Sequence, residues 1–90
     1  MSCDLSEDEI DELYWFYSKH LLSERANLHE EAVYRRLGSK VPKVREVVKR
    51  LRTKGYIGKH KTMCLYAAAG PTIRALQAHR PFFLPPYLRL

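Results

Sequence analysis

This 90-residue sequence has few of the features that several protein classes require. Its two cysteines, Cys3 and Cys64, are too few for a disulfide framework. Its four glycines are isolated, so it has no glycine-rich loop of the kind that cradles a phosphate. Its apolar runs are only a few residues long, and its acidic N-terminus has no apolar segment, so we expect neither a membrane span nor a signal or transit peptide. We therefore expect a cytoplasmic protein.

Motifs for metal binding and catalysis are missing as well. The histidines and cysteines form neither a CxxC nor an HxxxH pair, so the sequence predicts no metal site and no cofactor. A chain of this length supports a single hydrophobic core, which leaves little room for a pocket beside it. We therefore expect a protein that is not an enzyme and that takes no small-molecule ligand.

The charge of the sequence is distributed very unevenly. Hydrophobic residues make up 46% of the chain and charged residues 29%, which is typical of a globular domain, and the net charge is +6. Residues 1–31 hold nine acidic and two basic side chains, whereas residues 32–90 hold fourteen basic side chains and one acidic. Eleven of those bases lie within residues 35–61. Such asymmetry predicts a nucleic acid or another anionic surface as the partner.

Hydrophobic periodicity predicts four helices and one β-hairpin. The spacing of Ser6 and Glu9 is that of a capping box, which marks the start of the first helix. A glycine at position 38 ends the second helix, and a proline at position 42 opens the third. The expected elements are helices over residues 7–24, 28–37, 42–54 and 72–80, and strands over residues 56–57 and 63–66 with a basic loop between them.

The third helix combines an apolar stripe with a cationic surface. Its stripe consists of three valines and a leucine at helical spacing, Val44, Val47, Val48 and Leu51. Basic residues occupy most of the remaining circumference. The short helix and tight turn before it, and the basic hairpin after it, favour a helix-turn-helix with a wing over a merely solvated charged face.

The segment LGSKVPKVREVVKRLRTKGYI, from Leu37 to Ile57, resembles the recognition-helix region of winged-helix DNA-binding proteins, especially MarR-like and ArsR-like regulators. The match lies in the spacing of Leu37, Gly38, Val44, Val48, Leu51 and Gly55, and the resemblance covers about residues 8–80. It implies a mainly helical domain with a small β-hairpin over residues 1–80, in the order helix, helix, helix, strand, strand, helix. Residues 81–90 form an apolar, proline-rich tail.

This resemblance implies a transcriptional regulator that binds double-stranded DNA with its third helix in the major groove. At the start of that helix, Arg45 or Lys49 would pair with guanine and Glu46 would accept from a cytosine amine. The residues expected to face base edges are Lys43, Arg45, Glu46 and Lys49. The alternative for Glu46 is an ion pair within the helix, with Arg50, Lys43 or Lys49.

The remaining cations are predicted to contact the DNA backbone or to be solvated. Those on and around the helices are Arg35, Arg36, Lys40, Arg50, Arg52 and Lys54. Those of the wing, Lys59, His60 and Lys61, would lie along the flanking backbone or in the minor groove.

Apolar residues outside this pattern predict a homodimer. Trp15 and Leu22 lie on the side of the first helix away from Leu13, and the tail adds further aromatic side chains. The expected dimer contacts are Trp15, Leu22, Phe82, Phe83 and Leu84. A two-fold dimer would place two recognition helices about 34 Å apart, one turn of DNA. The alternative is that the tail folds back over the first helix and completes a small core.

Two other functions are compatible with the same fold. One is a winged helix that serves as a protein–protein interaction module and uses the aromatic first helix and the tail as its working surface. The other is RNA binding through the same basic face. Salt dependence and preference for duplex or single-stranded nucleic acid distinguish these functions from DNA binding.

Overall fold

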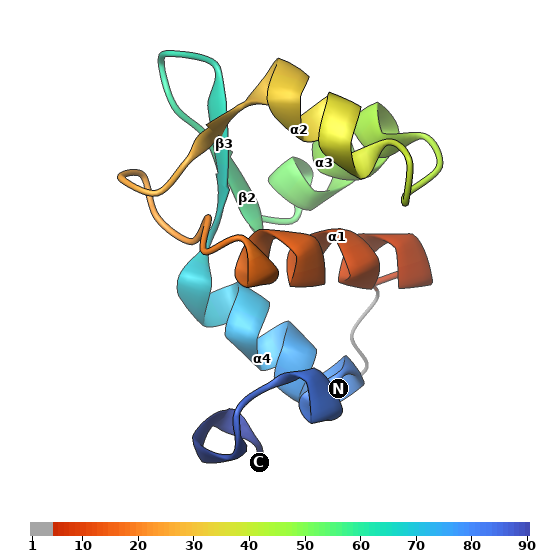
Figure 1. The fold of residues 1–90 in the computed structure, drawn as a ribbon, viewed down its shortest axis with the longest axis vertical. Helices are drawn as coiled ribbons and strands as arrows, with labels where there is room; N and C mark the ends of the chain where they lie inside the picture. The colour runs from red at the N-terminus through yellow and green to blue at the C-terminus, as the bar shows by residue number, and fades with distance from the viewer. Residues whose placement is uncertain (1–4) are drawn as a thin grey trace.

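A computed structural model describes residues 5–90 of the chain (Figure 1). Its elements are α1 (Glu7–Ser18), β1 (Leu28–His29), α2 (Glu30–Leu37), α3 (Val44–Thr53), β2 (Ile57–Lys59), β3 (Cys64–Ala67) and α4 (Ala69–His79), followed by 3-10 turns at Pro81–Phe83 and Pro86–Leu88. The expected mainly helical fold with a small β element is confirmed at this level. None of the described helices has the length and apolar composition needed to cross a membrane. Cys3 lies outside the described residues.

The β element is a three-stranded antiparallel sheet rather than the expected hairpin. Its strand order is β1-β3-β2, with Leu28 opposite Leu65 and Ile57 opposite Ala67. The predicted start of the second helix at residue 28 is therefore wrong, because Leu28 and His29 are extended and pair with β3. The helix N-cap is His29, whose Nδ1 accepts a hydrogen bond from the backbone N–H of Glu31 at 3.2 Å.

The ends of the first and last helices also differ from the prediction. The capping box is confirmed: Ser6 N–H donates to Glu9 Oε1 at 2.7 Å, and Glu9 N–H donates to Ser6 Oγ at 3.2 Å. α1 ends at Ser18 instead of residue 24, because His20 is left-handed with φ 59° and the Leu21 carbonyl accepts from Ala67 N–H. α4 begins at Ala69 instead of residue 72, so Pro71 lies within its first turn. Proline is tolerated there because the N–H that it lacks would have no acceptor inside the helix.

Helix α1 is the central element of the core. It lies between α2 and α3 on one side and α4 on the other (Figure 1). Leu13 and Phe16 are fully buried, and Trp15 is only 5% exposed and packs edge-on against Phe16 with ring centroids 5.3 Å apart. Trp15, which the sequence analysis assigned to a dimer interface, is therefore covered within the chain itself. Because other parts of the same chain cover α1 on two sides, this helix buries aromatic residues on more than one face without needing a second copy of the chain.

The C-terminal tail folds back onto α1. Leu84 is buried in a second apolar cluster with Ile10 of α1 and Leu76 of α4. Leu84 thus agrees with the alternative prediction, in which the tail folds back and completes a small core. Phe82 and Phe83, the residues before it, remain exposed.

Helix α1 also buries a carboxyl group. Glu12 of α1 is fully buried, and neither of its carboxyl oxygens has a hydrogen-bond partner among the described residues. Burial, followed by the nearby carboxylate of Glu9, raises the pKa of Glu12 to about 8, and Arg50 opposes this shift. The folded chain therefore keeps Glu12 protonated at neutral pH.

We expect replacement of Glu12 by glutamine to remove a pH dependence of stability. From the ordinary pKa of 4.5 up to about 8, the unfolded chain loses the Glu12 proton while the folded chain retains it, so stability falls as the pH rises. Because each pKa unit corresponds to about 1.4 kcal/mol, Glu12→Gln should gain roughly 2–4 kcal/mol on the wild type between pH 5 and pH 8. Urea unfolding across this range measures the difference.

The matched control is Glu46→Gln, which makes the same chemical change at an exposed position of α3. Its stability should stay within about 0.5 kcal/mol of the wild type at every pH. A Glu12→Gln variant whose advantage does not grow with pH would show that Glu12 is ionised in the folded chain.

Candidate nucleic-acid interface

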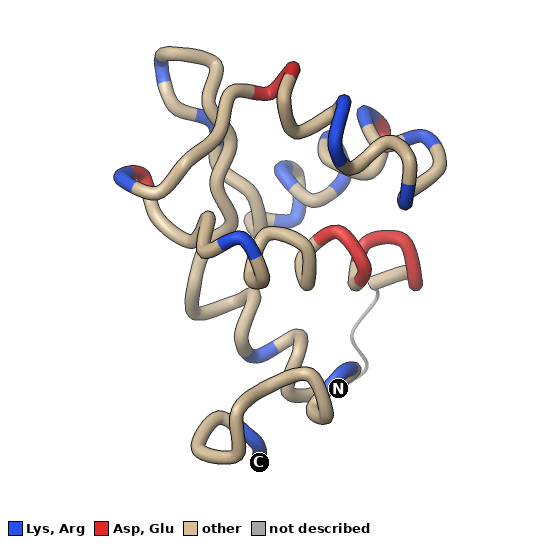
Figure 2. The backbone as a smooth tube through the Cα atoms, viewed as in Figure 1, with Lys and Arg blue, Asp and Glu red and all other residues tan. Residues whose placement is uncertain are grey.

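Helix α3 has the two-sided character that the sequence predicts. Val47, Val48 and Leu51 are buried in the main core, and the basic residues between them are exposed. Figure 2 shows basic residues around α2, α3 and the β2–β3 hairpin, whereas the acidic residues of α1 occupy its first half. The uneven charge of the sequence therefore becomes a basic surface in the fold.

The start of α3 has an unusual backbone. Its N-cap is Lys43, which is left-handed with φ 53° and makes no capping hydrogen bond with its side chain. A residue other than glycine is disfavoured in this conformation because its Cβ crowds the following carbonyl. Turning the chain at Lys43 sets the angle at which α3 leaves the α2–α3 loop.

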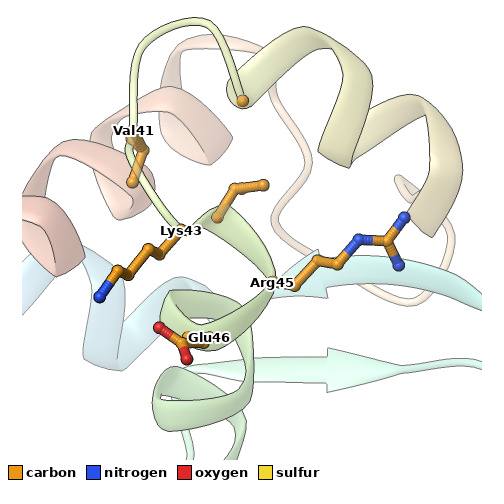
Figure 3. A pocket seen from close by; sticks show the side chains of 6 residues that line it. Val41, Lys43, Arg45 and Glu46 are labelled. Atoms are coloured by element: carbon orange, nitrogen blue, oxygen red, sulfur yellow. The ribbon is translucent and has the colours of Figure 1, made fainter.

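A surface hollow of about 340 Å³ lies at this end of α3 (Figure 3). Figure 3 shows the side chains of Lys43 and Glu46 on one side of the helix, while Arg45 extends to the other. The lining residues are Gly38, Val41, Lys43, Val44, Arg45 and Glu46. Three of the four predicted base-reading residues thus surround one hollow.

Arg45 is directed towards α2. Its guanidinium lies 3.7 Å from the carboxylate of Glu31, and its Cζ lies 4.4 Å from the centroid of the Tyr34 ring. The side chain is still 67% exposed, so the contacts hold it on the surface rather than bury it. Neither Glu31 nor Tyr34 was among the predicted site residues, because nothing in the local sequence pattern brings α2 beside the start of α3.

Lys49, the fourth predicted reader, lies further along the helix with cations from another element. A second hollow, of about 400 Å³, separates α3 from β2 and is lined by Lys49, Arg52 and Lys59 among others. Lys59, at the loop end of β2, also makes a 2.8 Å ion pair with Glu30 at the start of α2, and its ammonium lowers the pKa of Glu30. Side chains predicted separately for the helix and for the wing thus share one groove.

The opposite flank of α3 is attached to α1 through Glu9. Lys54 Nζ lies 2.9 and 3.1 Å from the two carboxylate oxygens of Glu9, and Arg50 Nε lies 3.8 Å away. Burial alone would raise the pKa of Glu9, but hydrogen bonds from Ser6 and Lys54 lower it below the usual value. Arg50 and Lys54 therefore help to hold α1 against α3, and they would have to leave Glu9 to bind a ligand. The sequence pattern identified Glu9 only as a capping residue.

Glu46 makes no ion pair with any of residues 5–90, so the helical pair with Arg50 that the sequence allows is not formed. Ion pairs are likewise missing, within this part of the chain, for Lys43, Lys49 and Arg52.

The remaining predicted residues are all exposed. Arg35 and Arg36 lie at the end of α2, Lys40 lies in the α2–α3 loop, and His60 and Lys61 lie at the hairpin tip. His60 Nδ1 accepts from Thr62 N–H at 3.3 Å, which fixes the ring against its own loop.

The residues predicted for a dimer interface fall into two groups. Trp15 and Leu84 are buried within the chain, so they have almost no surface left for a partner. Leu22 is half-buried, and Phe82 and Phe83 are exposed on the tail. An interface through this region would therefore have to use the tail rather than Trp15.

We expect Lys43→Gly to stabilise the fold. Glycine adopts the left-handed conformation freely, so the change should raise the free energy of unfolding by about 1 kcal/mol, the lower end of the usual cost of a side chain there. Lys43→Ala is the matched control, because it removes the same charge but keeps a Cβ in the left-handed conformation. Denaturation of both variants measures the effect, and equal stabilities would show that the turn is not strained.

Comparison with known proteins provides no relative for this chain: no protein-family model, no curated protein and no solved structure matches it. Among residues 5–90, no group of three or more histidine, cysteine, aspartate or glutamate side chains is placed to hold a metal ion. The site therefore consists of exposed cations on α3 around Glu46, the one carboxylate of that helix, with the half-buried Lys59 of β2 beside them.

Proposed function

We propose that this chain is a winged-helix protein that binds double-stranded DNA and regulates transcription. In this proposal α2 and α3 form the helix-turn-helix, α3 enters the major groove and the β2–β3 hairpin is the wing. The role is that of a binding protein rather than an enzyme, and it requires no cofactor. The observation that carries the proposal is the set of exposed cations along α3 that make no ion pair within residues 5–90, which are Lys43, Lys49 and Arg52.

The order of the elements supports a winged helix. A helix, α1, precedes a helix-turn-helix pair, and an antiparallel hairpin follows directly after α3. The short strand β1 adds to β3 on the side away from β2, so the hairpin is anchored to the domain by a third strand. Such anchoring supports the hairpin in a fixed position beside α3.

The charges on α3 support a nucleic acid as the ligand. Lys43, Lys49 and Arg52 carry no acidic partner within residues 5–90 and stand exposed along about two turns of helix. Cations held apart on a solvated helix repel one another, and a line of phosphates removes that repulsion while it releases counterions. An α-helix also has the diameter that the major groove of B-DNA admits.

The start of α3 supports sequence-specific rather than purely electrostatic binding. Glu46 is the one acidic residue in residues 32–90, and it is exposed without an ion pair beside Lys43. A carboxylate there would repel phosphates, but it accepts a hydrogen bond from a cytosine amine in the major groove. Lys43 and Glu46 are therefore the pair best placed to distinguish base pairs, with Arg45 available once it leaves Glu31.

We expect the double variant Lys49→Ala/Arg52→Ala to weaken duplex binding uniformly across sequences. Because each phosphate contact adds about one to the slope of log K against log salt, the slope should become shallower by about two. Lys19→Ala/Arg74→Ala is the matched control, since it removes the same charge from exposed positions just after α1 and on α4. Titration of a random duplex at several salt concentrations gives both slopes, and equal slopes for the two variants would exclude α3 as the contact surface.

We expect Glu46→Ala to relax sequence preference at one base pair without weakening overall affinity. Loss of a hydrogen bond to cytosine costs about 1–3 kcal/mol of discrimination at that position, while removal of a negative charge favours the phosphates everywhere. Selection of bound duplexes from a random pool, for wild type and variant, measures this. An unchanged preference would mean that Glu46 does not face a base.

Two results would favour the other functions. Tighter binding of single-stranded or A-form RNA than of duplex DNA would favour RNA recognition through the same cations. No salt-dependent binding of any nucleic acid would favour a protein-interaction module, whose working surface would be α1 and the tail.

A further inference from the structure

The loop at the tip of the β2–β3 hairpin exposes a large apolar side chain. Met63 is 44% exposed, and among residues 5–90 it is the one large exposed hydrophobic residue that lies outside the C-terminal tail. Exposed basic and polar residues, His60, Lys61 and Thr62, come directly before it. Met63 was not among the residues predicted for the wing, because the sequence pattern singled out only its cations.

The backbone at Met63 is of a kind that favours glycine. Met63 is left-handed, with φ 65°, and its N–H donates to the carbonyl of His60 at 2.9 Å, which closes the turn. A side chain in this conformation is disfavoured because its Cβ crowds the following carbonyl. Lys43 at the start of α3 is also left-handed, so both elements proposed to contact DNA contain such a residue. Strained residues cluster at functional sites, so methionine in place of glycine indicates a role for its side chain.

The loop that carries Met63 is held firmly. His60 N–H donates to the carbonyl of Cys64 at 2.7 Å, and the N–H of Glu30, at the start of α2, donates to the carbonyl of Met63 itself at 2.9 Å. Lys59 and the carboxylate of Glu30 join the hairpin and α2 again through their 2.8 Å ion pair. Because the backbone of the loop is already ordered, little of its conformational freedom is lost when it binds a ligand.

Charge and position indicate which ligand fits the loop. Lys61 makes no ion pair within residues 5–90, and residues 60–63 include no acid. In Figure 1 the loop lies with α2 at the end of the molecule opposite the tail. An apolar side chain beside cations matches the minor groove of a duplex, where phosphates form the rims and sugars and base edges form the floor. Proteins that bind there frequently insert methionine or another apolar residue between base steps.

We propose that Met63 is an apolar wedge, which enters the minor groove of a bound duplex and partly unstacks one base step. The proposal rests on the proposed function, because it requires a duplex that lies along α3 and the wing. Methionine suits this role, since its unbranched and polarizable side chain adapts to an irregular surface.

A wedge and a cation select different sequences at the minor groove. Pyrimidine–purine steps such as TA are easily kinked and unstacked, so the wedge of Met63 favours them. Runs of A are stiff and have a narrow, strongly negative minor groove, which favours cations such as Lys61. The sequence that the protein prefers beside its recognition site therefore shows which of the two residues dominates at the tip.

Titration of two duplexes tests the wedge. Both contain the sequence that the wild type selects from a random pool, and they differ only in flanks that consist of TA steps or of runs of A. The wild type should bind the TA-flanked duplex at least about fivefold more tightly, as expected for a contact that deforms DNA. Met63→Ala keeps a Cβ in the left-handed conformation but removes the wedge, so the preference should disappear or reverse. Lys61→Ala is the matched control from the same loop, and it should weaken binding but retain the preference for TA flanks.

Two further variants separate the side chain of Met63 from its backbone. Met63→Leu retains an apolar wedge and should retain the preference. Met63→Gly should lose it, although relief of the left-handed conformation should raise its folding equilibrium constant at least about fivefold over that of Met63→Ala. Urea denaturation measures both folding constants. A preference that is lost in the more stable of two variants does not result from unfolding.

Fluorescence of the DNA gives a direct signature of insertion. A 2-aminopurine base at the TA step fluoresces more strongly when it is unstacked, so its signal should rise with the wild type and stay unchanged with Met63→Ala. The proposal is overturned by a wild type that binds both duplexes equally or prefers runs of A, by a Met63→Ala variant that keeps the TA preference, or by a signal that the wild type does not raise. Each of these results leaves duplex binding intact, whereas failure to bind any duplex would overturn the proposed function as well.

Discussion

The carboxylate of Glu9 joins the start of α1 to the end of α3, and the position of the basic helix depends on this contact. The side chain is 2% exposed and is held by the backbone of Ser6 on one side and the ammonium of Lys54 on the other. Removing one partner of such a buried pair leaves an uncompensated charge, which typically costs about 3–5 kcal/mol. The contact therefore determines which flank of α3 turns inward and which remains free.

The same contact explains why α1 tolerates two buried carboxyl groups one turn apart. Hydrogen bonds from Ser6 and Lys54 favour the charged form of Glu9, and this charge is one reason why Glu12 keeps its proton. Two ionised carboxylates in a core this small would repel each other without enough donors to satisfy both. α1 thus combines one ionised and one neutral acid in a region that apolar residues otherwise fill.

Local patterns in the sequence were sufficient to predict the elements that depend on them. The valine spacing of α3 identified its buried stripe, and the spacing of Ser6 and Glu9 identified the start of α1. Tertiary contacts decided the rest: Leu28 and His29 become a strand only because β3 is available to pair with them. Trp15 is buried because it belongs to the main core together with residues of other elements, such as Val41 of the α2–α3 loop, and no periodicity within α1 reveals this.

The basic residues of the candidate site could be identified from composition. Which of them are free to bind a ligand could not be predicted, because their acidic partners come from distant positions in the sequence. Lys43, Lys49 and Arg52 have no such partner among the described residues and can meet phosphates at once. Arg45 is held by Glu31 in an exposed pair, a kind of contact worth only about 0–1 kcal/mol, so a nucleic acid can displace it. Arg50 and Lys54 share a buried carboxylate and would have to weaken the packing of α1 to leave it. The surface proposed to bind a ligand is therefore narrower than the surface that is positively charged, because Glu9 holds Arg50 and Lys54.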